Sequence, residues 1–170
     1  LVFDDLAINT ALARLDCLAG LGNVKKAIHD FVQSARYLQS RGEDYLGNGL
    51  LSWRFIGKSG TGKSTVAEIM AAILKGMRLI ATSHIVEIKG ERILNVSDYD
   101  CDLVLRDAVK RSCNGLVFID VDASECGEFP TNYYRRIEYV LMRLKELTIE
   151  LGGECALIVA ELIDSVPNGD

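Results

Sequence analysis

A nine-residue segment from Gly57 to Thr65 constrains this chain of 170 residues more than any other feature. Its sequence, GKSGTGKST, meets the pattern G-x-x-x-x-G-K-S/T, in which backbone N–H groups and a lysine surround phosphate oxygens. An apolar run at residues 50–56 leads into the segment, and a run with helical periodicity at residues 66–74 follows it. This strand–loop–helix context favours binding of a purine nucleoside triphosphate, most simply ATP, together with magnesium (Mg2+).

Each residue type in the segment has a predicted task. Gly60 and Gly62 allow the backbone conformations that aim N–H groups at phosphate oxygens, and the start of the following helix adds a favourable field. Lys63 is expected to reach the β- and γ-phosphates, the Ser64 hydroxyl to ligate magnesium, and Thr65 to lie near the α-phosphate. The loop residues predicted to bind the nucleotide are Ser59, Gly60, Thr61, Gly62, Lys63, Ser64 and Thr65.

An acidic residue at the end of another apolar run supplies the second predicted part of the site. Phosphoryl chemistry needs a carboxylate near the magnesium, and Asp120 directly follows the apolar run at residues 116–119. We therefore predict Ser64 and Asp120 as magnesium ligands, and Asp120 and Lys63 as catalytic residues.

Apolar runs and helical periodicities alternate along the chain. The predicted elements are a helix at 23–38 capped by Asn23, a loop at 41–49, strands at 50–56, 85–88, 116–119 and 156–160, and helices at 66–74, 101–109 and 137–147. The alternation predicts an α/β fold of the P-loop NTPase type, a parallel sheet with helices on both faces. Ligands of such sheets bind at the carboxyl ends of strands, where Gly57, Asp120 and Glu161 fall. We expect a single domain, with N-terminal helices in residues 1–45 and the P-loop core in residues 46–166.

Composition and charge exclude several classes of protein. The net charge of −5 argues against a general nucleic-acid binder, and no apolar run approaches the roughly 20 residues that span a bilayer. No signal peptide opens the chain, and its five scattered cysteines fit reduced thiols, so a cytoplasmic protein is expected. Because the first residue is Leu1 and not Met, we expect the chain to be part of a longer protein.

Several segments together resemble a known family. The sequences LAGLGNVKKAI at residues 18–28, HIVEI at 84–88 and GLVFID at 115–120, combined with the glycine-rich loop, resemble the AAA+ ATPases of the stage V sporulation protein K and CbbX (red-type Rubisco activase) group. The resemblance covers roughly residues 15–162 and implies the large subdomain of an AAA+ module, with Gly20 and Leu21 lining the adenine pocket. It also implies ring oligomers, often hexameric, that remodel a protein partner by ATP turnover.

The chain departs from this family pattern at positions tied to hydrolysis. The family carries Asp-Glu after the apolar strand, with the glutamate polarising the attacking water, whereas Val121 follows Asp120 here. Residues 95–99 contain no match to the family's aromatic pore loop, and Arg135 and Arg136 do not match its arginine finger. The chain ends before the expected fifth strand and helical lid. Hydrolysis is therefore expected to be weak, while magnesium binding through Asp120 is retained.

The leading hypothesis is an ATP- and magnesium-binding AAA+ module with weak hydrolysis. It would serve a larger protein-remodelling assembly, beside a neighbouring AAA+ domain or another protein partner. Three alternatives stay open. The module is a fully active ATPase in which Asp122 or Glu161 replaces the missing glutamate; it is a small-molecule P-loop kinase; or it is a protein-interaction domain with a relic loop that binds no nucleotide.

Overall fold

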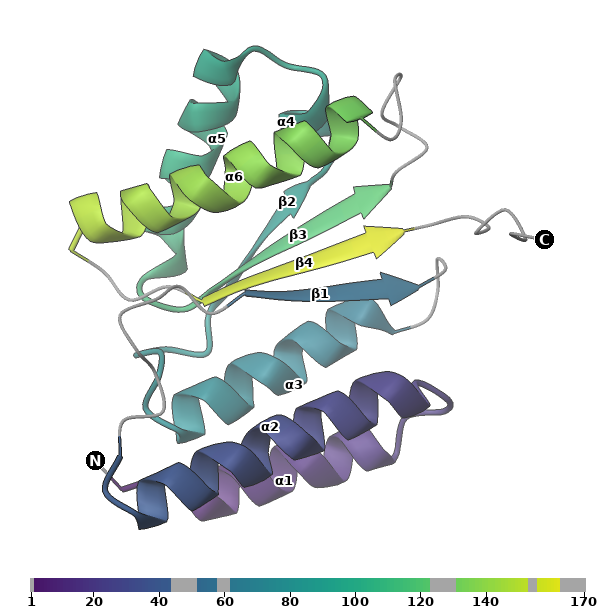
Figure 1. Ribbon diagram of the computed structural model, residues 1–170, viewed down its shortest axis with the longest axis vertical. Coiled ribbons are helices and arrows are strands. Elements are labelled where there is room, and N and C mark those ends of the chain that lie inside the picture. Colours follow the sequence, from purple (N-terminus) through teal and green to yellow (C-terminus); the bar gives the residue numbers. More distant parts are fainter. Residues whose placement is uncertain (1, 44–51, 58–61, 123–130, 153–155, 163–170) are drawn as a thin grey trace.

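The computed structural model describes residues 2–43, 52–57, 62–122, 131–152 and 156–162, in which helices and strands alternate after two N-terminal helices (Figure 1). The helices are α1 (Asp5–Asp16), α2 (Gly22–Ser40), α3 (Lys63–Gly76), α4 (Glu91–Leu94), α5 (Asp98–Ser112) and α6 (Thr131–Glu150). The strands are β1 (Ser52–Gly57), β2 (Ile85–Lys89), β3 (Leu116–Asp122) and β4 (Ala156–Leu162).

The four described strands form one parallel sheet in the order β1-β4-β3-β2. Since all of them run the same way, their carboxyl ends meet at one edge, on the right of Figure 1. At that edge Asp120 of β3 lies in register with Lys89 of β2 on one side and with Ala160 of β4 on the other. These four strands confirm the predicted α/β architecture, a parallel sheet with helices on both faces.

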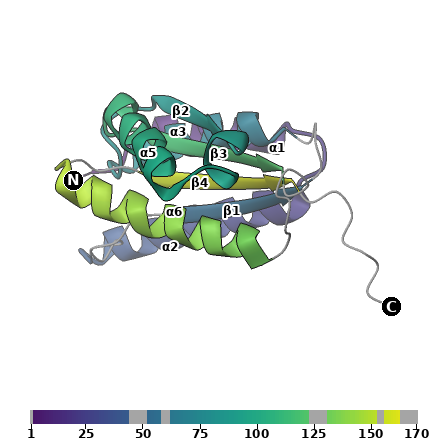
Figure 2. The same cartoon turned by 90° about the horizontal axis from the view of Figure 1, so that it is seen from above.

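The side chains of β3 divide the core into two halves because successive residues of a strand point to opposite faces. Leu116 and Phe118 pack with α1, α2 and α3. Val117, Ile119 and Val121 pack instead with α4, α5 and α6. Figures 1 and 2 show the result, with α5 and α6 over one face of the sheet and α3 against the other.

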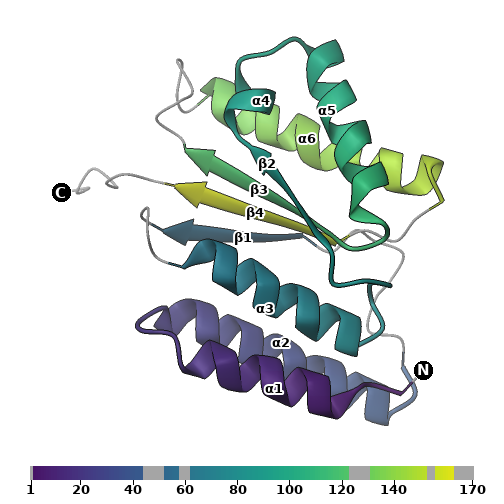
Figure 3. The same ribbon diagram turned by 180° about the vertical axis from the view of Figure 1, so that it is seen from behind.

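The helix α1 runs antiparallel to α3 and fixes the N-terminal part of the chain against the core (Figure 3). The two helices approach so closely that a Cβ on Gly76 would lie 2.8 Å from Cγ1 of Ile8. At the other end of the pair, the Arg14 guanidinium lies 2.8 Å from the Glu68 carboxylate. The turn after α1 is thereby held beside the first turns of α3.

The first residues of two helices differ from the prediction. Asn23 was expected to cap α2, but α2 begins at Gly22 and its N-cap is Leu21, in the left-handed conformation with φ 58° and no side-chain cap. The preceding Gly20 also has a positive φ, so the chain turns sharply before Asn23 and leaves it inside the helix. In α5 the cap is Ser97, whose hydroxyl accepts a hydrogen bond from the Asp100 N–H at 3.1 Å. Residues 50–51 of the strand predicted at 50–56 lie outside the described residues. So does Pro130, a residue type suited to the entry of the helix predicted at 137–147.

The two longest described helices, α2 and α6, each bury one stripe of side chains. In α2 this stripe is Ile28, Val32 and Ala35, and in α6 it is Tyr133, Ile137, Val140, Leu144 and Leu147. The remaining faces of both helices are mostly polar, as expected for amphipathic helices that pack on a core, although α2 exposes Tyr37 and α6 exposes Tyr134, Met142 and Ile149. Among the helices of the described ranges, none has the length and apolar character that crossing a membrane requires.

Candidate functional site

The connection between β1 and α3 carries the predicted phosphate-binding segment. β1 ends at Gly57 and α3 begins at Lys63, while Ser59, Gly60 and Thr61 lie outside the described residues. Gly62 is the N-cap of α3 and has φ +83°, a conformation that costs most other residues about 1–2 kcal/mol. The glycine therefore lets the chain turn directly into a helix whose first N–H groups can bind an anion.

Lys63 and Asp120, the two predicted catalytic residues, lie close together. The Lys63 Nζ is 3.9 Å from the Asp120 Oδ1, and their side chains are 11% and 32% exposed. Asp120 lies on the α3 face of the sheet, since it alternates with Ile119 and Val121, which pack on the opposite face. Ser64, the predicted magnesium ligand, follows Lys63 in the first turn of α3 and is exposed.

A second lysine, which the sequence analysis missed, contacts the same carboxylate. Lys89 ends β2, and its Nζ lies 3.4 Å from the Asp120 Oδ2 and 2.8 Å from the Glu87 Oε1. The hydrogen bond to Glu87 raises the pKa of Lys89; burial opposes it, and the charges of Glu87 and Asp120 add to it. The signal that selected Asp120, a charged residue just after an apolar strand, also marks Lys89.

Val121 occupies a different environment from Asp120, although it is the next residue. Its side chain is fully buried among the α4–α6 residues of the core. The backbone there is crowded: the Gly90 N–H donates to the Asp120 carbonyl at 2.8 Å, and a Cβ on Gly90 would lie 3.1 Å from the Val121 Cα. The end of β3 therefore presents a carboxylate to one face and an aliphatic side chain to the other.

The two residues considered as substitutes for the missing glutamate are described only by their backbone positions. Glu161 of β4 pairs in register with Val121, and Asp122 pairs with Leu162. Their side chains lie outside the described part of the structure.

Gly20 and Leu21, the residues assigned to the adenine pocket by resemblance, form the turn between α1 and α2. Both have positive φ values, 69° and 58°. Lys25 donates a hydrogen bond to the Leu18 carbonyl across this turn, and Leu18 and Leu21 pack against the core beside α3. Figures 1 and 3 place the turn at the end of the molecule that also holds the first turn of α3 and the carboxyl ends of the strands.

Arg135 and Arg136 lie in the second turn of α6, and the structure gives Arg136 a structural contact. Its guanidinium donates to the Asp98 carboxylate and to the Val96 carbonyl, both at 2.8 Å. These bonds tie α6 to the start of α5. Tyr99, the aromatic residue of the segment 95–99 that does not match the family's pore loop, is 73% exposed in the same region.

The side chains present fit a triphosphate with magnesium. The buried ammonium of Lys63 suits phosphate oxygens, and Ser64 and Asp120 supply oxygen ligands of the kind that magnesium prefers. No group of three or more His, Cys, Asp or Glu side chains in the described ranges could hold a metal by itself. Magnesium sites commonly use one or two carboxylates together with phosphates and water. The bound ion would neutralise charge on the phosphates.

Sequence similarity relates the chain to known proteins. No family model matches the chain. The chain is 31% identical over 121 residues to the ESX-1 secretion system protein EccA1 of Mycolicibacterium smegmatis, covering 68% of this chain and 21% of that protein. It is also 31% identical over 110 residues to the stage V sporulation protein K of Bacillus subtilis, covering 62% of this chain and 34% of that protein.

Both similarities support a relationship to the AAA+ ATPases without singling out a group within them. The chain spans about a fifth of the first relative and about a third of the second. Among solved structures, a chain of the E. coli MS115-1 HORMA:CdnC:Trip13 complex matches with a TM-score of 0.49 and 14% identity, over 96% of this chain and 62% of that chain.

Proposed function

We propose that this chain is an ATP- and magnesium-binding P-loop module of the AAA+ type. We further propose that it hydrolyses ATP weakly and acts within a larger protein-remodelling assembly. The observation that carries the proposal is the approach of the Lys63 ammonium to within 3.9 Å of the Asp120 carboxylate, at the first turn of α3 and the carboxyl end of β3. A lysine and a carboxylate held there suit the phosphates and the magnesium ion respectively.

The proposal gives each residue of the candidate site a role in binding the nucleotide or the magnesium ion. Lys63 binds the β- and γ-phosphates, Ser64 and Asp120 hold the magnesium, and the turn at Gly20 and Leu21 contacts the adenine. The first N–H groups of α3 favour the negative charge of the phosphates. Ring assembly and a protein partner also belong to this proposal.

The weakness of hydrolysis rests on Val121. A buried valine can neither orient a water molecule nor accept its proton, and its side chain packs on the face of the sheet opposite to Asp120. The site therefore holds residues suited to binding but lacks a general base at the position after Asp120.

The proposal is tested first by calorimetric titration of ATP with magnesium into the wild type, Lys63→Ala and Asp120→Asn. Binding by the wild type is expected, with at least a ten-fold loss in Lys63→Ala because the ammonium contributes directly to phosphate binding. Lys110→Met, which removes an exposed lysine of α5, is the control that should bind as the wild type does. Absence of wild-type binding at millimolar ATP would instead support an interaction domain with a relic loop.

Single-turnover hydrolysis then separates weak from full activity. The expected result is little or no product from the wild type under conditions that saturate binding. Clear turnover that is lost in both Lys63→Ala and Asp120→Asn would overturn the weak-hydrolysis part. It would favour the active ATPase that uses Asp122 or Glu161, and Asp122→Asn and Glu161→Gln would show which carboxylate is used.

A further inference from the structure

Both oxygens of the Asp120 carboxylate face an ammonium group. Oδ1 lies 3.9 Å from the Nζ of Lys63, and Oδ2 lies 3.4 Å from the Nζ of Lys89. Lys89 reaches this position from the neighbouring strand because it is the register partner of Asp120 in the parallel pair β2–β3. In-register residues of neighbouring strands share a face of the sheet, which brings the two side chains together.

Two further contacts fix Lys89 at this place. Glu87, two residues earlier and on the same face of β2, contacts the Lys89 ammonium at 2.8 Å. The next residue, Gly90, donates its N–H to the Asp120 carbonyl at 2.8 Å, which anchors the chain just after Lys89. The lysine is therefore positioned by strand register, by a carboxylate on its own strand and by the backbone that follows it.

The charged side chains around Asp120 set the electrostatic environment for a divalent ion. The two carboxylates of Asp120 and Glu87 are balanced by the two ammonium groups of Lys63 and Lys89. A magnesium ion held by Asp120 would meet the positive charge of the Lys89 ammonium, which lies 3.4 Å from the Asp120 carboxylate, and like charges repel. The side chain of Lys89 is 59% exposed, so it can swing away, at the cost of its contacts to Asp120 and Glu87. A bound triphosphate, in contrast, would be stabilised by a second cation near Lys63.

We propose that Lys89 is a built-in counter-cation that holds Asp120 and competes with magnesium for its carboxylate. Nucleotide binding by the wild type therefore depends less on magnesium than binding by a variant that lacks the Lys89 ammonium. This inference rests on the proposed nucleotide site. Lys89 is a positioning residue in this role, because it acts through Asp120.

The test measures the affinity for a fluorescent ATP analogue, mant-ATP, once with EDTA and once with excess magnesium. The dissociation constant with EDTA divided by that with magnesium gives the magnesium dependence of binding. Lys89→Met is expected to raise this ratio by about 10-fold over the wild type, an effect of the size that electrostatic neighbours produce at such distances. Lys89→Arg keeps the positive charge and should restore the wild-type ratio. Lys110→Met, on the surface of α5, should leave the ratio unchanged.

The outcomes separate this inference from the proposed function. An unchanged ratio in Lys89→Met, with mant-ATP binding still lost in Lys63→Ala, overturns the role of Lys89 alone. If neither the wild type nor any variant binds mant-ATP, with EDTA or with magnesium, both the proposed nucleotide site and the role of Lys89 are wrong. Circular dichroism verifies that each variant is folded, and Lys89→Gln replaces Lys89→Met in the same measurement if the methionine variant does not fold.

Discussion

At the scale of single residues, neighbouring positions at the end of β3 have opposite roles. Asp120 faces α3 and two lysines, whereas Val121 is fully buried in the other half of the core. A strand imposes this division, because each step along it changes the face of the sheet. Two adjacent residues therefore serve different purposes, Asp120 in the candidate site and Val121 in the hydrophobic core.

Replacing Val121 with glutamate, the residue that the AAA+ pattern carries, should destabilise this protein. The carboxylate would enter an apolar environment without a partner, which costs about 3 kcal/mol or more. Urea unfolding followed by circular dichroism measures the loss. Val121→Thr, of nearly the same shape, should cost only about 1–2 kcal/mol. A Val121→Glu variant that is as stable as the wild type and hydrolyses ATP would contradict this view of β3.

The residues of the candidate site differ in how far the sequence could predict them. The placement of Lys63 and Asp120 beside each other follows from the motif and from the rule that parallel strands end at one edge. The contact of Lys89 with Asp120 depends on which strands are neighbours and in which register, and neither follows from local sequence. The left-handed Leu21 was missed because a positive φ at leucine is rare.

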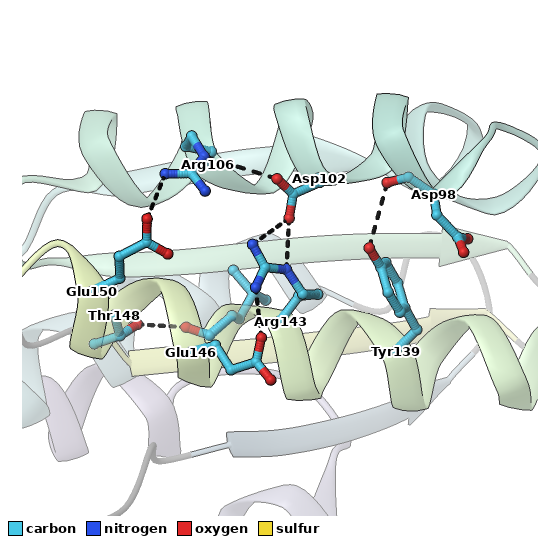
Figure 4. Close-up of polar contacts among 9 residues, drawn as sticks. Asp98, Asp102, Arg106, Tyr139, Arg143, Glu146, Thr148 and Glu150 are labelled. Atoms are coloured by element: carbon cyan, nitrogen blue, oxygen red, sulfur yellow. Dashed lines mark hydrogen bonds and ion pairs between the residues drawn. The ribbon is translucent and has the colours of Figure 1, made fainter.

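At the scale of elements, a cluster of charged side chains joins α5 to α6 (Figure 4). The Asp102 carboxylate receives the Arg143 guanidinium at 2.6 Å and lies 3.8 Å from Arg106, which also contacts Glu150 at 3.1 Å. Arg143 further contacts Glu146 at 2.5 Å. The bonds to Glu146 and then to Asp102 raise the pKa of Arg143. These side chains close the outer surface of the α4–α6 half of the core.

A double-mutant cycle on Arg143→Ala and Asp102→Ala should give a coupling energy of about 1–2 kcal/mol. The pair is only 20% and 23% exposed, so solvent screens it less than an open surface pair. The matched control is Lys26 and Asp30 on α2, an exposed pair at 3.5 Å with an expected coupling below about 0.5 kcal/mol. Equal coupling energies from denaturant unfolding would show that the cluster adds nothing specific.

Tyr139 gives the α5–α6 contact a pH dependence. Burial raises the pKa of Tyr139 above 10.0, helped by the charges of Asp102 and Asp98, and the neutral hydroxyl donates to the Asp98 carbonyl at 3.4 Å. A raised pKa means that folding favours the protonated form, so this contribution is complete below about pH 10 and is lost as the pH rises further. The free energy of unfolding should therefore fall more steeply above pH 10 in the wild type than in Tyr139→Phe. Identical pH profiles would contradict this prediction.

Most elements were predictable from periodicity, because one face of each packs on a core. The strands at 85–88 and 116–119 agree with β2 and β3 to within a few residues. The entry into α2 was not predictable, since a Gly-Leu-Gly turn and not a side-chain cap sets its first residue.

At the scale of the whole molecule, a nucleotide that binds the folded chain alone should stabilise it by mass action. ATP with magnesium at about 100 times its Kd adds about 2.7 kcal/mol to the free energy of unfolding. For a domain of this size the melting temperature should rise by about 5–10 °C. Differential scanning calorimetry measures the shift. At the same ATP concentration, the loss of affinity in Lys63→Ala should reduce the shift to about half or less, while Lys110→Met keeps it. A shift of equal size in Lys63→Ala would place the nucleotide elsewhere.

The general architecture followed from the alternation of strand and helix patterns, but the order of the strands did not. Each crossover connects parallel strands over a face of the sheet, and several orders satisfy the same local pattern. Only the assembled sheet shows that β4 inserts between β1 and β3. This insertion brings Glu161 beside Val121 and separates β1 from β3.

The position of β1 has a consequence for motion. Within the described sheet β1 is an edge strand bonded to β4, while β3 and β4 have neighbours on both sides. Amide hydrogens of β1 that face away from β4 should exchange with solvent sooner than those of β3, because edge strands open locally without unfolding the core. Since β1 ends at Gly57, directly before the glycine-rich segment, this edge position predicts that exchange reaches the residues before that segment sooner than it reaches Asp120 on the central strand β3.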